Sequence, residues 1–148
     1  MATATRRTTA TPEAVWAVLA DGWMYANWVV GTSHMRAVEA TWPAVGSKLF
    51  HASGLWPVVR RDETEVEESA PFSRLVVRAK ARPFGEARVV LEIASDGEGS
   101  DLSMTEVPVR GPGKLLHNPV ADLVLLRRNV EALARLAALA ERRRHPAD

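Results

Sequence analysis

The spacing of apolar and polar residues changes along the chain and divides it into three parts. The first part opens with a threonine-rich alternation over Ala2–Thr9, which is typical of a strand at the edge of a sheet. A helix is expected after Thr11, because a threonine cap followed by Pro12 at the first helical position is a common start signal. Asp21-Gly22 ends this helix, and a second short helical turn is expected over Trp23–Trp28.

From Thr32 to Val107 the apolar residues recur at every second position, which indicates strands. Residues with turn chemistry separate six such segments. The strands expected here are His34–Ala40, Ser47–Ser53, Val58–Glu67, Ser73–Arg82, Glu86–Ala94 and Asp101–Val107. Their connections are too short for crossover helices, so neighbouring strands should pair as an antiparallel meander.

The last part predicts one long amphipathic helix that begins with Asn118 as cap and Pro119 at its first position. Its apolar residues recur at alternating spacings of three and four. This stripe contains Val120, Leu123, Leu126 (or Val124), Val130, Leu133, Ala137 and Ala140, and the opposite face contains Arg127, Arg128, Glu131, Arg135 and Arg142. The element order predicts an α+β fold in which a curved seven-stranded antiparallel sheet is covered by the C-terminal helix, an arrangement that tends to leave a cavity.

Composition narrows the classes of function. A chain of 148 residues is the size of one ordinary domain, so residues 1–148 are expected to form a single unit. The absence of cysteine excludes disulfides, thiolate metal sites and a cysteine nucleophile. A net charge of +1 argues against a nucleic-acid partner. No signal peptide and no apolar run of membrane-spanning length is found, so we expect a cytoplasmic protein that does not insert into membranes.

Five tryptophans are many for a chain with one tyrosine and three phenylalanines, and such rings can line a ligand cavity. Trp16 is expected in the core, and Trp42 is expected to pack a loop. Trp23 and Trp28 flank a short turn that would close one end of a cavity. Trp56 lies in a predicted hairpin loop and is the candidate for an aromatic side chain at the cavity entrance.

Strand alternation places four ionisable residues in phase with inward-facing apolar ones: His51, Arg60, Asp62 and Glu106. Charged groups in such positions form pairs, lie at a wet cavity mouth or have shifted pKa values. Glu106 is either a general acid or polar anchor, or a structural carboxylate bonded to the backbone or to Arg110.

The other three residues also have two interpretations. Arg60 and Asp62 either serve chemistry or form an in-strand ion pair, and a β-bulge would turn both outward. His51 either transfers protons or is a structural hydrogen-bonding residue. The histidines have no metal-binding spacing, and no Gly-x-Ser-x-Gly motif is present, so we expect no metal, no cofactor and no serine triad. Arg142–Arg144 are interpreted as a solubilising helix end in preference to a phosphate or membrane contact.

Several spaced motifs resemble one known superfamily across nearly the whole chain. They are Ala10–Leu19, Trp28–Gly31, Trp42–Gly46, Asp62–Val66, and Met104–Glu106 followed by Gly111-Pro112. These motifs resemble the START-related SRPBCC superfamily, also called polyketide cyclase/dehydrase-like. The resemblance implies a helix-grip fold with a deep hydrophobic cavity between sheet and long helix. Relatives use this cavity to bind lipids, polyketides or other apolar ligands, and a minority catalyse reactions in it.

Three functions follow as hypotheses. The first is a binder of a small hydrophobic ligand, with no assigned catalysis. Its contacts would be an apolar wall with Trp56 at the entrance and His51, Asp62 and Glu106 as polar anchors; the wall contains Trp28, Leu75, Val77, Val89, Leu91, Met104, Leu123 and Val130. The second is a polyketide cyclase or dehydratase in which Glu106 or Asp62 donates a proton and His51 is the base. The third, least favoured, is an interaction protein that uses the helix stripe. The chain is expected to be a monomer or a homodimer.

Overall fold

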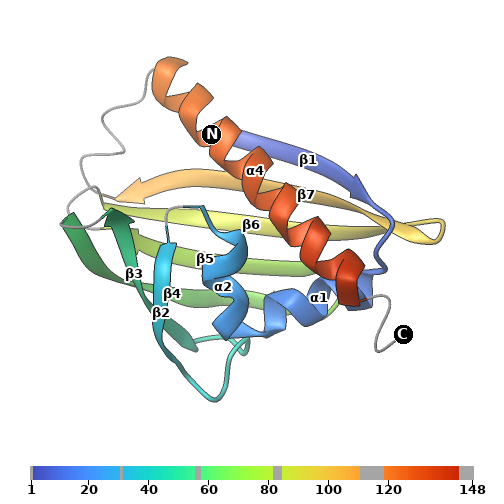
Figure 1. Cartoon of the computed structure of the whole chain (residues 1–148), viewed down its shortest axis with the longest axis horizontal. Coiled ribbons are helices and arrows are strands. Elements are labelled where there is room, and N and C mark those ends of the chain that lie inside the picture. Colours follow the sequence, from blue (N-terminus) through green and yellow to red (C-terminus); the bar gives the residue numbers. More distant parts are fainter. Residues whose placement is uncertain (1, 31, 56–57, 82–84, 111–118, 144–148) are drawn as a thin grey trace.

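A computed structural model describes residues 2–30, 32–55, 58–81, 85–110 and 119–143. The predicted order of elements is confirmed (Figure 1). The elements are β1 (Ala2–Thr8), α1 (Pro12–Ala20), the 3-10 turn η1 (Gly22–Met24), α2 (Tyr25–Trp28), β2 (Thr32–Val38), β3 (Lys48–Leu55), β4 (Val58–Ala70), β5 (Arg74–Ala81), β6 (Gly85–Asp96), β7 (Gly99–Arg110) and α4 (Pro119–Arg143).

The strands form one antiparallel sheet in the order β1-β7-β6-β5-β4-β3-β2. Sequential strands from β2 to β7 are neighbours, as a meander requires. β1 is the exception, because it pairs with β7 at the far edge, with Ala2 opposite Glu106. The sheet curves around α4 and the short helices (Figure 1), so the predicted α+β helix-grip fold is confirmed.

Most strand boundaries differ from those predicted, by one to three residues. β2 ends at Val38, because the chain turns from Glu39 onward. The Glu39 amide still donates a hydrogen bond to the Lys48 carbonyl, at 3.1 Å. β4 continues to Ala70, three residues beyond its predicted end. The pairing of β4 with β5 shifts between Val66 and Glu68. Such a bulge shifts the alternation of inward and outward side chains. The polar residues after it therefore do not continue the pattern from which the strand was predicted.

The start of α1 follows from the local sequence. Thr11 has an extended backbone and its hydroxyl accepts a hydrogen bond from the Ala14 amide at 3.2 Å. Pro12 occupies the first helical turn, where no backbone donor is needed. The buried residues of α1 include Trp16, confirming its expected place in the core. Trp42 is also buried, and its indole N–H donates to the Leu19 carbonyl at 3.0 Å.

Helix α4 crosses the concave face and packs against β1, β7, α1 and α2 (Figure 1). Its buried residues lie from position 129 onward and are Asn129, Ala132, Leu133, Leu136, Ala137 and Ala140. The predicted stripe is therefore wrong at Leu123, which is 50% exposed, and at Val130, which is 48% exposed although Asn129 and Ala132 on either side of it are buried. The turns before Asn129 extend past the edge of the sheet, which leaves Leu123 no surface to cover (Figure 1). Val130 is exposed because it lies on a different side of the helix from Asn129, Leu133 and Leu136.

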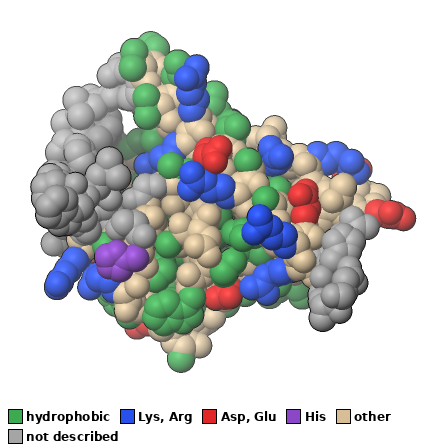
Figure 2. Space-filling model, in the orientation of Figure 1, with side chains coloured by type: hydrophobic (Ala, Val, Ile, Leu, Met, Phe, Trp, Pro, Cys, Tyr) green, Lys and Arg blue, Asp and Glu red, His purple; other side chains and the backbone are tan. Residues whose placement is uncertain are grey.

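The exposed apolar residues of α4 are visible as hydrophobic side chains where the helix begins, at the upper end of the molecule (Figure 2). They are Val120, Leu123, Val124, Leu126 and Val130. Within the described ranges, no helix has both the length and the apolar character needed to cross a membrane.

Candidate functional site

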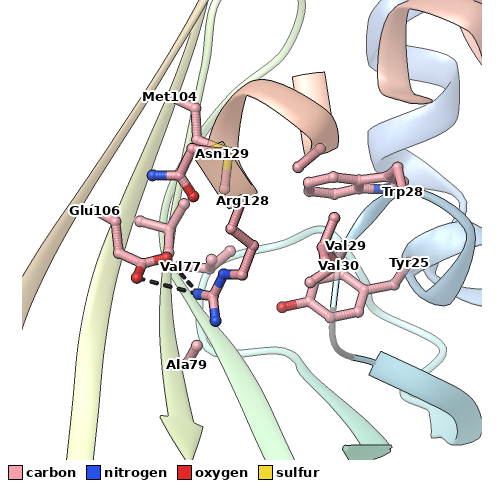
Figure 3. Close-up of a pocket in the computed structure, with 12 residues that line it drawn as sticks. Tyr25, Trp28, Val29, Val30, Val77, Ala79, Met104, Glu106, Arg128 and Asn129 are labelled. Atoms are coloured by element: carbon pink, nitrogen blue, oxygen red, sulfur yellow. Dashed lines mark hydrogen bonds and ion pairs between the residues drawn. The ribbon is translucent and has the colours of Figure 1, made fainter. Parts of the chain in front are cut away.

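A small pocket lies between the concave face of the sheet and the helices α2 and α4 (Figure 3). Its cavity volume is about 60 Å³, well below the roughly 300 to 1,000 Å³ of usual ligand pockets. The cavity is thus smaller than the resemblance implied. Twelve residues line it: Tyr25, Trp28, Val29, Val30, Val77, Ala79, Val89, Met104, Glu106, Arg128, Asn129 and Ala132. Most are apolar, and the polar groups gather where β7 faces α4.

The polar end of the pocket contains a charged pair. Glu106 on β7 is buried, with its side chain 6% exposed, whereas the Arg128 side chain on α4 is 44% exposed. One guanidinium nitrogen, Nη2 of Arg128, lies 2.9 Å from Oε1 and 3.1 Å from Oε2 of Glu106 (Figure 3). Arg128 was expected on the solvent face of the helix, but its long side chain reaches back to the sheet. Glu106 is paired with this residue. The side chain of Arg110, its partner in one interpretation of the sequence, lies outside what the structure describes.

A second polar arrangement runs from the pocket into the sheet. The hydroxyl of Tyr25 lies 3.1 Å from Oγ1 of Thr64, and Nε2 of His51 lies 3.0 Å from the same oxygen. All three residues are buried. The rings of Tyr25 and His51 lie at a tilt of 32° with centroids 5.2 Å apart. The rings of Tyr25 and Trp28 form a T-shaped pair with centroids 5.4 Å apart. We call Tyr25, Thr64 and His51 the buried hydrogen-bond chain; only Tyr25 reaches the pocket itself.

Burial favours the neutral forms of both titratable residues in this chain. It raises the pKa of the Tyr25 phenol above its usual value, an effect that the hydrogen bond with Thr64 and the charge of Arg128 partly offset. Burial also lowers the pKa of the His51 imidazole, and the carboxylate of Asp62 offsets part of that shift. The two residues therefore present an uncharged phenol and an uncharged imidazole near neutral pH.

Asp62 faces inward from β4 directly opposite His51 on β3, so the predicted phases of both residues are confirmed. Its Oδ1 atom is buried and has no hydrogen-bond partner among the described residues. Asp62 borders a different, open hollow with Arg36, Lys80 and other polar residues, and does not line the pocket. The side chain of Arg60 lies outside what the structure describes, and so does Trp56.

The structure brings together five of the residues expected around a ligand: Trp28, Val77, Val89, Met104 and Glu106. Leu75 and Leu91 are buried in the adjoining core without bordering the pocket. Leu123 and Val130, expected on the apolar wall, are exposed on α4 and do not line it, for the reasons given above. Trp23, expected to close one end of the cavity, is 57% exposed, and only its neighbour Trp28 lines the pocket.

Three polar residues of the site were missed by sequence reasoning: Tyr25, Arg128 and Asn129. A signal for Asn129 was present, since positions 129, 133, 136 and 140 continue a spacing of three and four along the buried face of α4. An asparagine in such a stripe is a buried polar residue and hence a candidate for function. The described part of the chain contains no cluster of three acidic or histidine side chains placed to hold a metal ion.

The fold and this pocket define a helix-grip protein with a small, mainly apolar site that has one polar end. The family described as polyketide cyclase / dehydrase and lipid transport matches residues 1–141. The chain belongs to this family, which confirms the resemblance seen in its motifs. A search of proteins with curated descriptions gave no significant match.

Solved structures share the fold. The Zhui aromatase/cyclase from Streptomyces sp. R1128 is 20% identical, with a TM-score of 0.73 over 98% of this chain and 95% of its own. A protein from Nitrosomonas europaea is 15% identical, with a TM-score of 0.72 over 96% and 94%. The di-domain ARO/CYC protein StfQ from the steffimycin biosynthetic pathway is 12% identical, with a TM-score of 0.73, and this chain covers 50% of its length. At these identities the similarity establishes the fold alone.

Proposed function

We propose that this protein binds a small hydrophobic ligand in the pocket between the sheet and α4. The observation that carries the proposal is the lining of this pocket: an aromatic and aliphatic wall closed at one end by the Glu106–Arg128 pair. Concave, mostly apolar sites with a few convergent polar groups are the usual form of small-molecule sites. Trp28, Val77 and Met104 are the proposed apolar contacts, and Glu106 is the proposed polar anchor.

The small cavity sets a condition on binding. A cavity of about 150 Å³ lined by apolar residues accepts benzene, whereas this one measures about 60 Å³. A ring can enter only if a lining side chain moves. Arg128 is the side chain suited to this movement, because it crosses the pocket toward Glu106 and is partly in solvent (Figure 3). Ligand entry is therefore expected to move the aliphatic part of the Arg128 side chain aside while its guanidinium remains paired with Glu106.

The test uses methionine methyl groups as reporters. The chain has four methionines, of which Met104 lines the pocket and Met24 and Met35 do not. Titration with toluene should shift the Met104 methyl resonance in a protein labelled with ¹³C at these methyls, and leave Met24 and Met35 in place. Native mass spectrometry of gently purified protein should also reveal any ligand that co-purifies.

Two variants localise the binding. Ala79→Leu adds three carbon atoms in the pocket and should abolish the toluene shift, whereas Ala94→Leu on the exposed face of β6 should retain it. A Met104 methyl that does not respond to toluene or to larger aromatic probes would contradict the proposal. Equal responses in both alanine variants would place binding elsewhere.

The buried hydrogen-bond chain favours a second candidate, a cyclase or dehydratase. A neutral imidazole can accept a proton, and Thr64 connects it to the Tyr25 phenol at the pocket. In a dehydration, the base would remove the proton next to a carbonyl, and a proton donor would convert the departing hydroxide to water. Glu106, Asp62 and His51 remain the catalytic residues proposed from sequence, and Tyr25 is added to them.

A β-hydroxyacyl thioester of N-acetylcysteamine tests this candidate, with the rise in absorbance of the unsaturated product as the readout. The wild-type protein should form the product faster than Tyr25→Phe, His51→Gln, Asp62→Asn and Glu106→Gln. Identical rates in all five proteins would exclude catalysis by these groups. Toluene binding without turnover would leave the binding function standing alone.

A further inference from the structure

The most unusual polar group of the pocket is the side-chain amide of Asn129. The residue is 0% exposed and lies on the buried face of α4, beside Met104 and the Glu106–Arg128 pair (Figure 3). Neither its Nδ2 nor its Oδ1 atom has a hydrogen-bond partner among the described residues. Both atoms therefore have hydrogen-bonding capacity that the described protein groups leave unused, at the wall of a cavity.

The Asn129 amide, unpaired among the described residues, destabilises the folded protein unless a group in the pocket forms hydrogen bonds with it. A buried amide that has lost its water partners and forms no hydrogen bond with the described residues is unfavourable. A leucine has nearly the same shape and would fill the position without that cost. Ala132, which lines the pocket three residues further along the helix, is apolar and compatible with such a substitution. The amide is thus best explained by a group that it binds.

The neighbouring charges restrict what that group can be. Both carboxylate oxygens of Glu106 already accept from Arg128, so the pair presents no net charge to the pocket. An anionic ligand would meet Glu106, and a cationic one would meet Arg128, each inside a mostly apolar wall. The favoured ligand group is therefore uncharged, and the amide next to it offers one N–H donor and one carbonyl acceptor.

We propose that Asn129 determines the specificity of the pocket by pairing its Nδ2 and Oδ1 atoms with an uncharged ligand that presents a hydrogen-bond donor beside an acceptor. A lactam is the simplest such group, since its N–H and C=O lie on the same edge. This proposal rests on the proposed binding function and adds the chemical class of the ligand. It also predicts that purely apolar molecules bind without using Asn129.

The composition of the chain makes the amide directly observable. The sequence contains no glutamine and only three asparagines, Asn27, Asn118 and Asn129. A ¹⁵N spectrum therefore has three side-chain amide nitrogen signals, and triple-resonance spectra of the wild-type protein assign that of Asn129. The probes are 2-pyrrolidinone, a lactam, and cyclopentanone, which has the same ring size and carbonyl but no donor. Toluene serves as the apolar reference.

In the wild-type protein 2-pyrrolidinone should shift the Asn129 amide signal and the Met104 methyl signal together. The ratio of lactam affinity to cyclopentanone affinity should be at least about ten-fold higher in the wild type than in Asn129→Leu. This difference corresponds to a loss of about 1.4 kcal/mol in the preference for the lactam. Asn27→Leu is the matched control, because the Asn27 amide is exposed and bonds to the sulfur of Met24 at 3.3 Å. It should leave the lactam preference unchanged.

The outcomes separate the two proposals. If toluene shifts Met104 but the lactam leaves the Asn129 amide unmoved, the specificity proposal is wrong and the binding function stands. The specificity proposal is equally wrong if Asn129→Leu keeps the wild-type preference for the lactam. If no probe shifts Met104, both proposals fail. The amide signal is measured in the wild-type protein, so the test does not depend on the variant folding.

Discussion

Arg128 reaches from solvent to the buried carboxylate of Glu106 and contacts both of its oxygens through a single nitrogen, at 2.9 and 3.1 Å. The two ends of this ion pair are in different environments, with side-chain exposures of 44% and 6%. Removal of Arg128 and removal of Glu106 therefore have different consequences. A freed Arg128 would be solvated, whereas a freed Glu106 would remain in the protein interior.

The pair should accordingly respond asymmetrically to mutation. Arg128→Met should lower the free energy of unfolding by about 2 kcal/mol, because it leaves a buried carboxylate without its cation. Glu106→Gln should lower it by less than about 1 kcal/mol, since Arg128 can turn to water. Urea unfolding measures both. The exposed pair Arg135 and Glu131 is the control, with a loss of at most about 0.5 kcal/mol on Arg135→Met. Equal losses for the two pocket variants would contradict the expected asymmetry.

The buried hydrogen-bond chain predicts a second ranking. Tyr25→Phe removes one hydroxyl and should destabilise the protein by about 1 kcal/mol. Thr64→Val keeps the shape of the side chain but removes the group that both Tyr25 and His51 contact, so a loss of about 2 kcal/mol is expected. Thermal unfolding followed by circular dichroism gives the order. A Thr64→Val variant as stable as the wild type would show that these contacts contribute nothing to stability.

Stability should also depend on pH through His51. Because its pKa is lowered in the folded protein, the unfolded chain binds the proton more readily in the range below the usual imidazole value of about 6.5. Above that pH both states are neutral and the residue has no effect. As the pH falls from about 6.5 toward the lower folded pKa, stability should decrease.

Urea unfolding at several pH values tests this dependence. The difference between wild type and His51→Gln should change across the range from about pH 7 to pH 5, with the wild type losing more stability on acidification. His34→Gln is the control for a general effect of removing a histidine. Parallel curves for wild type and His51→Gln would rule out a lowered pKa at this residue.

The two halves of α4 predict opposite responses to substitution. Leu133 is buried against the sheet, so Leu133→Ala should reduce stability by about 3 kcal/mol. Leu123 and Val130 lie in solvent, and their replacement by glutamine should change it by no more than about 0.5 kcal/mol. Chemical denaturation of the three variants is sufficient. A large loss for Leu123→Gln would mean that this surface is covered in solution.

Much of the fold follows from local patterns in the sequence. Alternation of period two assigned His51, Asp62 and Glu106 to the inner face, because one buried face fixes the phase of a strand. The helix stripe was less informative. A periodic pattern gives the direction of a helix face but contains no information on where the sheet beneath it ends, and so the exposure of Leu123 was not foreseen.

The site was harder to predict than the fold, and for a physical reason. The volume of a pocket is the small difference between the space left by the backbone and the volume of the side chains in it. Tyr25, Trp28 and Arg128 occupy much of that space, and the reach of a long arginine around its helix is not encoded in periodicity. Asn129 was detectable in principle, as a polar residue within a buried stripe.

The pairing of β1 with β7 has a consequence for the order of events in folding. The meander from β2 to β7 can assemble by adding each new strand to its predecessor, but β1 has no partner until β7 exists, almost 100 positions later in the chain. During synthesis β1 therefore remains unpaired until β7 has been made. Contacts between such distant segments form slowly. We expect β1, with α4 packed on it, to join last, so the final step of folding is also the one that closes the sheet over the helix.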